Sequence, residues 1–108
     1  MSRGSPRCKP VPQGVRQTAD LLERRWQLSI IYAALTGALR FNEFAEAVAG
    51  ISPRMLSERL RDLEAAGLVE RTVIPSSPPT VEYRLTARGR RLSPIIDAMR
   101  AYAGEPVG

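Results

Sequence analysis

The fold of this 108-residue chain is decided by one stretch, residues 50–64, which reads GISPRMLSERLRDLE. Ser52 can cap a helix with its hydroxyl, and Pro53 is pre-organised for the first helical position. One apolar face follows at i, i+4 and i+7, formed by Leu56, Leu60 and Leu63. The stretch therefore predicts a helix that begins at Ser52–Pro53, buries its leucines and is ended by Gly67.

Downstream of Gly67 the hydrophobic period changes from helical spacing to strict alternation. Residues 69–73 and 81–85 alternate apolar and polar side chains, and a turn-rich segment, Pro75–Pro79, separates them. This pattern predicts a β-hairpin. Thr86 is then expected to cap a final helix, in which Pro94 either introduces a kink or begins a new segment.

Upstream, three further helices are expected. Val15 begins a helical face, and a second helix follows Trp26, is apolar on most sides and is ended by Gly37. Asn42 is the expected N-cap of a short third helix that Gly50 closes. The order is four helices, a hairpin and a helix. The predicted fold is mainly α with a small β-hairpin, a winged helix-turn-helix.

The composition excludes several classes of site. The chain has no histidine and one cysteine, Cys8. Histidine-based nucleophilic catalysis, zinc-finger sites and an internal disulfide are therefore excluded. Glu43 and Glu46 lie close on one helix, but exposed carboxylates without a pocket are typical of a solvated surface. We expect no enzyme activity, no cofactor and no metal.

The charge balance favours a nucleic-acid partner. Sixteen basic residues, fifteen of them arginine, outnumber eleven acidic ones, and the isoelectric point is 10.3. No apolar run approaches the length of a membrane span, and the basic start lacks the apolar core of a secretory signal. We expect a soluble, cytoplasmic, nucleoid-associated protein with no membrane partner.

The chain divides into three parts. Residues 1–14 are rich in glycine and proline and are expected to form a flexible N-terminal arm. Residues 15–103 form the winged helix-turn-helix domain, and residues 104–108 form a tail.

Four sequence blocks resemble the HxlR family of bacterial winged-helix transcription regulators. They are Arg40–Phe44, Gly50–Glu64, Gly67–Arg71 and Pro78–Thr86. The resemblance covers about Val15 to Met99. It implies a homodimeric DNA-binding protein that assembles through its first and last helices.

Two departures from the family pattern matter. Many members carry a Cys-Pro pair at a fixed distance ahead of the tryptophan, and here Gln13-Gly14 occupy that slot. Cys8 lies further upstream between Arg7 and Lys9, which would favour its thiolate. Cys8 is therefore either a redox site or an incidental exposed cysteine. The second departure is the wing tip, Pro75–Val81, which carries no charge.

The helix that begins at Ser52 is the expected reading element, because the major groove admits a helix whose N-terminal side chains reach base edges. Arg54 can pair in a forked way with guanine, and two hydroxyls and four further arginines can reach base or phosphate. The full set of candidate DNA contacts is Arg25, Arg40, Ser52, Arg54, Ser57, Arg61 and Arg84. The alternative is that these arginines form surface ion pairs, such as Arg54 with Glu58. Arg59, nearer the core edge, is expected to form a structural salt bridge.

Two helical stripes are too apolar for a free surface on so small a domain. They are expected to form the dimer interface, unless the C-terminal stripe only closes the core of the monomer. The stripes comprise Val15, Ala19, Leu22, Leu92, Ile95, Ile96, Met99 and Tyr102.

The sequence predicts a sequence-specific transcription regulator that represses by binding an inverted-repeat operator as a homodimer. Double-stranded DNA is the expected partner, and an unidentified small-molecule or redox effector would change the spacing of the reading helices. The alternative is a winged-helix protein-interaction module that does not read DNA, because the reading helix carries as many acidic as basic residues.

Overall fold

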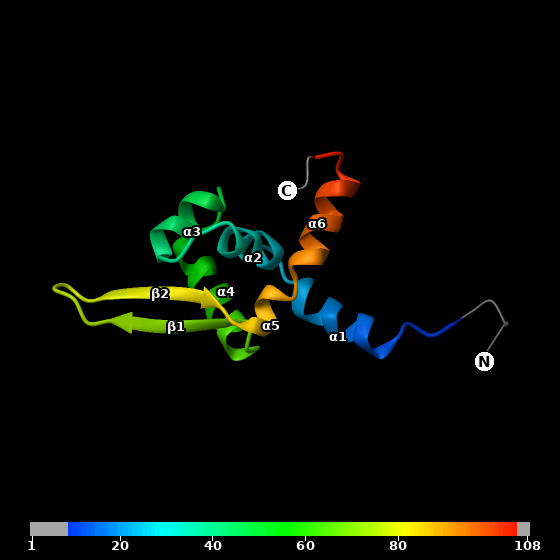
Figure 1. The fold of residues 1–108 in the computed structure, drawn as a ribbon, viewed down its shortest axis with the longest axis horizontal. Helices are drawn as coiled ribbons and strands as arrows, with labels where there is room; N and C mark the ends of the chain where they lie inside the picture. The colour runs from blue at the N-terminus through cyan, green and yellow to red at the C-terminus, as the bar shows by residue number, and fades with distance from the viewer. Residues whose placement is uncertain (1–8, 106–108) are drawn as a thin grey trace.

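The computed structural model describes residues 9–105, which form six helices and one hairpin (Figure 1). This mainly helical chain with a two-stranded antiparallel hairpin confirms the expected fold class. The elements are α1 (Gln13–Leu22), α2 (Gln27–Leu35), α3 (Phe41–Ala47), α4 (Pro53–Ala65), β1 (Val69–Ile74), β2 (Thr80–Leu85), α5 (Ala87–Arg90) and α6 (Ser93–Tyr102). Among the described residues, no helix is both long and apolar enough to cross a bilayer.

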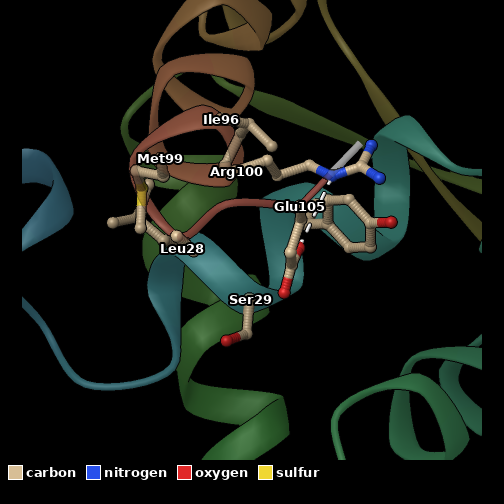
Figure 2. Close-up of a pocket in the computed structure, with 8 residues that line it drawn as sticks. Leu28, Ser29, Ile96, Met99, Arg100 and Glu105 are labelled. Atoms are coloured by element: carbon tan, nitrogen blue, oxygen red, sulfur yellow. Dashed lines mark ion pairs between the residues drawn. The ribbon is translucent and has the colours of Figure 1, made fainter. Parts of the chain in front are cut away.

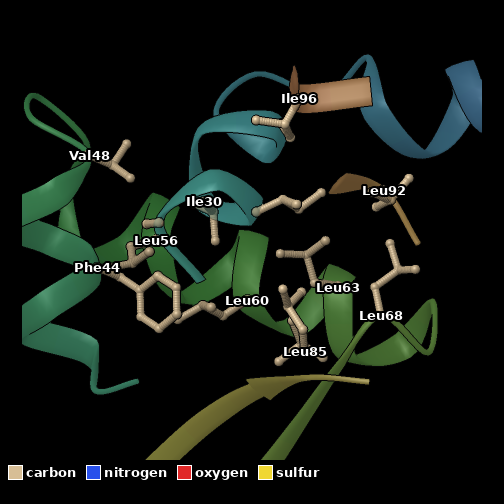
Figure 3. Close-up of a cluster of buried hydrophobic side chains, with 13 residues drawn as sticks. Ile30, Phe44, Val48, Leu56, Leu60, Leu63, Leu68, Leu85, Leu92 and Ile96 are labelled. Atoms are coloured by element: carbon tan, nitrogen blue, oxygen red, sulfur yellow. The ribbon is translucent and has the colours of Figure 1, made fainter. Parts of the chain in front are cut away.

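The core lies between α2, α3 and α4 and is closed by the hairpin and the start of α6 (Figure 3). The α4 stripe predicted from its spacing is fully buried, since Leu56, Leu60 and Leu63 are at most 1% exposed. Burial of a leucine side chain stabilises a fold by roughly 1.5–3 kcal/mol. The stripe therefore fixes which face of α4 turns outward.

The predicted helix boundaries at serine, threonine and proline are confirmed. Ser52 Oγ accepts a 3.1 Å hydrogen bond from the backbone N–H of Met55, and Thr86 Oγ1 accepts one of 3.1 Å from Gly89. Pro94 lies in the first turn of a separate helix, α6, rather than bending one long helix.

The hairpin is anchored to the helical body on both sides. Its register pairs Val69 with Leu85, and Tyr83 N donates a 2.7 Å hydrogen bond to the carbonyl of Leu39, which precedes α3. Gly89 of α5 lies so close to the hairpin base that a Cβ there would collide with the carbonyl oxygen of Leu68. These contacts set the direction in which the hairpin leaves the body (Figure 1).

Two local expectations are wrong. Asn42 is not the N-cap of α3, because the helix begins at Phe41, two residues earlier than that cap implies, and Arg40 occupies the cap position. The carboxylate of Glu43 reaches back to the free N–H groups there, so a cap side chain at Asn42 is not needed. At the other end of the domain, α1 begins at Gln13, so Gln13 and Gly14 belong to the helix and not to the arm.

The junction between α1 and α2 has an unusual backbone. Trp26 adopts a φ of 77°, the one positive φ of a non-glycine residue within residues 9–105. A bulky side chain rarely tolerates this left-handed conformation. The Trp26 ring lies under the guanidinium of Arg25 at 4.7 Å and reaches the α3–α4 turn at Gly50. This junction lets α1 point away from the body (Figure 1).

The C-terminal apolar stripe is divided between the core and the surface. Leu92 and Ile96 are 8% and 6% exposed and pack in the core, so their expected place in a dimer interface is wrong. The helical period could not separate these two roles, because one continuous stripe is buried at its N-terminal end and exposed at its C-terminal end. Met99 and Tyr102 remain outside the core, at 47% and 95% exposure.

Candidate nucleic-acid interface

Arg54 is the side chain that α4 presents most openly. It lies in the first turn of the helix, immediately after the Ser52 cap and Pro53, and its side chain is 90% exposed. Its one ion pair, with Glu58, is long at 3.3 Å and lies in solvent. Such a pair contributes little to stability, so the guanidinium is available to an external acceptor.

A second group of polar side chains lies where α4 meets the hairpin. Ser57 and Arg61 of α4 line a cavity of about 380 Å³ together with Arg71 and Tyr83 of the strands, and Glu64 completes its wall. The structure thus brings Arg61 and Ser57, both predicted as DNA contacts, to the same concave surface. The hydroxyl of Ser52, in contrast, is engaged in capping α4.

Arg71 is a member of this group that the sequence did not single out as a contact. It pairs in register with Tyr83, so its side chain lies on the hairpin face that also carries Val69 and Leu85. That face is turned towards the helices because both of those residues are buried. The apolar–polar alternation predicted that Arg71 lies on a strand, but only the strand register shows that its side chain lies beside α4.

Arg84, which the sequence predicted as a DNA contact, does not lie beside the other predicted contacts on α4. It alternates with Tyr83 and therefore lies on the opposite hairpin face from Arg71. Its Nη2 atom lies 2.7 Å from Oε1 of Glu82, and Glu70 is its register partner across the hairpin. The structure does not bring Arg84 together with the exposed arginines of α4.

Arg25 and Arg40 are both exposed at the starts of helices, as the sequence predicted. Arg25 stacks over Trp26, and this cation–π contact fixes its guanidinium near the α1–α2 junction. Arg40 is the N-cap residue of α3. The two residues lie outside the concave surface formed by Arg61 and Arg71.

Arg59 has the structural role predicted for it. Its side chain is 15% exposed, and its Nη1 atom lies 2.7 Å from Oδ2 of Asp62. The same Asp62 oxygen accepts a 2.9 Å hydrogen bond from Arg24, a contact that the sequence did not indicate. Arg59 of α4 and Arg24 of the α1–α2 junction therefore share one carboxylate, which holds α4 against that junction.

The electrostatics of α3 centre on Glu43. Its Oε1 atom accepts hydrogen bonds from the backbone N–H of Arg40 at 3.0 Å and of Leu39 at 2.8 Å. These bonds favour the charged form and lower the pKa of the Glu43 carboxyl below its ordinary value. Glu43 therefore acts as a helix cap, and its hydrogen bonds go to the backbone before α3 and not to Glu46.

The described residues, 9–105, contain no group of three or more metal-ligating side chains. Cys8 and any role it has in redox chemistry lie outside that range.

A family model described as HxlR-like helix-turn-helix matches residues 21–107 of this chain. Among curated proteins, the chain is 42% identical over 89 residues to the uncharacterized HTH-type transcriptional regulator YvaP of Bacillus subtilis. That alignment covers 82% of each chain.

Two solved structures of related regulators have the same fold. The reduced form of the transcriptional regulator YodB from B. subtilis matches with a TM-score of 0.77 and 37% identity, over 87% of this chain and 92% of that one. The oxidized form of the redox regulator HypR matches with a TM-score of 0.78 and 41% identity, over 84% of this chain and 94% of that one. These relatives are transcription regulators, not enzymes.

Proposed function

The chain belongs to the HxlR-like helix-turn-helix family of transcription regulators, and from this we propose that it is a sequence-specific repressor that binds an inverted-repeat operator as a homodimer. Arg54 carries the proposal. A 90% exposed guanidinium in the first turn of α4 suits forked pairing with guanine in the major groove. Ser57 and Arg61 extend the contact along α4, and Arg71 adds a phosphate contact from the hairpin.

The homodimer is supported by apolar side chains that the monomer leaves in solvent. α1 contributes no buried residue to the core. Val15 is 56% exposed on α1, and Met99 and Tyr102 are exposed on α6. To bind two half-sites one turn of DNA apart, the two-fold pairing of these helices would have to place the two α4 helices roughly 34–36 Å apart. Ala19 and Leu22 of α1 and Ile95 of α6, all half-buried, would border this interface.

Repression follows from position alone, because a dimer bound at a promoter blocks polymerase without a specific contact to it. In the cell, the protein would act in the cytoplasm at the nucleoid. A reporter driven by the bound promoter tests the sign of regulation. Expression should rise when the gene is deleted, and a fall would make the protein an activator.

The experiment that tests DNA reading measures fluorescence anisotropy with promoter DNA from the gene's own neighbourhood and with a scrambled duplex of equal composition. We expect much tighter binding to the promoter DNA and a strong loss of affinity as salt rises. Equal affinity for both duplexes would refute sequence reading. Binding to neither duplex would favour the protein-interaction module, to which the balanced charge of α4 and the uncharged wing tip would be suited.

An effector is part of the proposal, and its chemistry is either a redox signal or a small molecule. The redox regulator HypR is one of the structural neighbours, which is compatible with a redox signal. Cys8, however, does not occupy the family's usual cysteine slot. We expect DNA binding by a Cys8→Ser variant to respond to the oxidant diamide as the wild type does. An oxidant-blind variant would assign redox sensing to Cys8.

A further inference from the structure

We propose that the cavity between α2 and α6 is a binding site for a small organic monocarboxylate with an apolar body. The cavity has a volume of about 370 Å³, which lies in the lower part of the range typical of small-molecule sites. None of its lining residues belongs to α4 or to the hairpin, which carry the proposed DNA contacts. Its lining comprises Leu28, Ser29, Tyr32, Ile96, Met99, Arg100, Ala103 and Glu105.

The cavity has an apolar end and a charged end. Leu28 and Met99 lie together at one end, whereas Arg100 and Glu105 face each other at the other end (Figure 2). Ile96 supplies a buried apolar wall beside Arg100. This arrangement suits a ligand that has one polar head and one apolar body.

Arg100 is the group that would bind the head. Its side chain is 27% exposed, and its guanidinium lies 5.9 Å from the ring centroid of Tyr32. Its Nε atom is 3.7 Å from Oε1 of Glu105, which is beyond hydrogen-bond distance. Within residues 9–105, the guanidinium makes no hydrogen bond, so its N–H donors are available to an acceptor from outside.

Glu105 marks where the ligand's carboxylate would lie. The end of α6 turns back at Gly104, whose φ is 79°, and Glu105 N then donates a 2.9 Å bond to the carbonyl of Arg100. This turn directs the Glu105 carboxylate at the guanidinium, although its side chain is 63% exposed. A ligand carboxylate approaching from the apolar end would displace this weak internal partner.

The cavity offers a single cationic group to an anionic head. Arg100 is its one cationic side chain, and Glu105 is its one acidic side chain. A phosphate group carries up to two negative charges and is normally bound by several cations or N–H groups, whereas a carboxylate is satisfied by one forked guanidinium. The site therefore fits a carboxylate better than a phosphate ester.

The position of the cavity connects such a ligand to the proposed dimer. Ile96, Arg100 and Ala103 form the cavity face of α6, and Met99 lies at its border with the exposed face that ends in Tyr102. A ligand against Met99 would change the packing of α6 on α2. The effect on DNA binding rests on the proposed function, but the binding site does not.

The test uses the full chain with benzoate and with benzamide, which has the same shape but no charge. Two-dimensional NMR should record saturable shifts with benzoate in the amides of residues 28–32 and 96–105, and weaker ones with benzamide. Arg100→Gln should weaken benzoate binding by roughly tenfold or more. Glu105→Gln should tighten it by up to about fivefold, because it removes the competing carboxylate. Arg90 is an exposed arginine outside the cavity, so Arg90→Gln should leave benzoate binding unchanged.

Equal binding of benzoate and benzamide would overturn the proposal. So would shifts that map elsewhere, or no saturation up to about 10 mM benzoate. The Glu105→Gln variant tests the site even if Arg100→Gln does not fold. Benzoate binding by a protein that does not bind DNA would support the cavity and refute only the proposed function.

Discussion

The Nε atom of Arg59 donates a 2.9 Å hydrogen bond to the backbone carbonyl of Arg25. This bond joins the middle of α4, the proposed reading helix, to the junction between α1 and α2. Asp62 strengthens the connection, since it accepts from both Arg59 and Arg24. The orientation of α4 is therefore fixed by polar contacts as well as by its leucines.

Replacing Arg59 with alanine should lower the free energy of unfolding by about 1–3 kcal/mol, because the carbonyl of Arg25 and the carboxylate of Asp62 lose a charged donor. Chemical denaturation followed by circular dichroism measures this. Arg61→Ala is the matched control on the same helix, where the side chain is exposed and the stability should change little. Equal losses in both variants would mean that Arg59 has no special structural role.

Replacing Arg54 with alanine should weaken operator binding by roughly 1–3 kcal/mol and leave the unfolding midpoint almost unchanged. The reason is that its 90% exposed side chain has only the long contact with Glu58 to lose. Anisotropy with operator and scrambled DNA separates the loss of base reading from a general loss of charge. Unchanged operator affinity would remove Arg54 from the reading surface.

Gly89→Ala should destabilise the fold by about 1–3 kcal/mol or more, because the new methyl group would collide with the Leu68 carbonyl and with Leu85. Gly14→Ala is the matched control. It lies in α1 with no atom within 4 Å of the added Cβ, and alanine there should stabilise the helix by about 0.5–1 kcal/mol. Thermal unfolding of the two variants should therefore shift in opposite directions.

The Glu43 cap makes stability depend on pH. Because the folded state lowers the pKa of Glu43, its carboxylate stabilises the fold above the ordinary value of 4.5, and this contribution is lost as the pH falls through the lowered pKa. Glu43→Ala should therefore be less stable than the wild type at pH 7, and the difference should shrink below pH 4.5. Glu46→Ala, in an exposed carboxylate of the same helix, is the control. A difference that stays constant with pH would contradict the cap.

Val15→Asp should dissociate the proposed homodimer, since it would place a charge in an apolar interface. Sedimentation velocity should show at least about a tenfold rise in the dimer dissociation constant. Val73→Asp is the matched control, because Val73 is a similarly exposed valine, at 51% against 56%, on the hairpin. A wild-type protein that is monomeric at all concentrations would refute the dimer.

Local signals in the sequence predicted much of this fold. The hydroxyls of Ser52 and Thr86 cap helices as expected, because an N-cap is satisfied by atoms within three residues. The spacing of the α4 leucines predicted their burial for a similar reason, since helical geometry alone places them on one face.

Features that depend on distant elements were not predictable in the same way. Leu92 and Ile96 are buried because α6 packs on α2. The spacing of residues within α6 does not indicate which helix it packs against. Strand register places Arg71 and Arg84 on opposite faces of the hairpin. The sequence indicated Arg84 as the DNA contact, but Glu82 offsets its charge. The α2–α6 cavity left no pattern in the sequence because its lining comes from two helices far apart in the chain.

Trp26 gives the domain a mechanical property. Its backbone sets the direction in which α1 leaves the body, and its ring lies beside the turn that precedes α4. The contacts of Arg24 with Asp62 and of Arg59 with the carbonyl of Arg25 brace the same junction. In the proposed dimer, a force applied through α1 would therefore be passed on to α4 and not absorbed at the junction between α1 and α2.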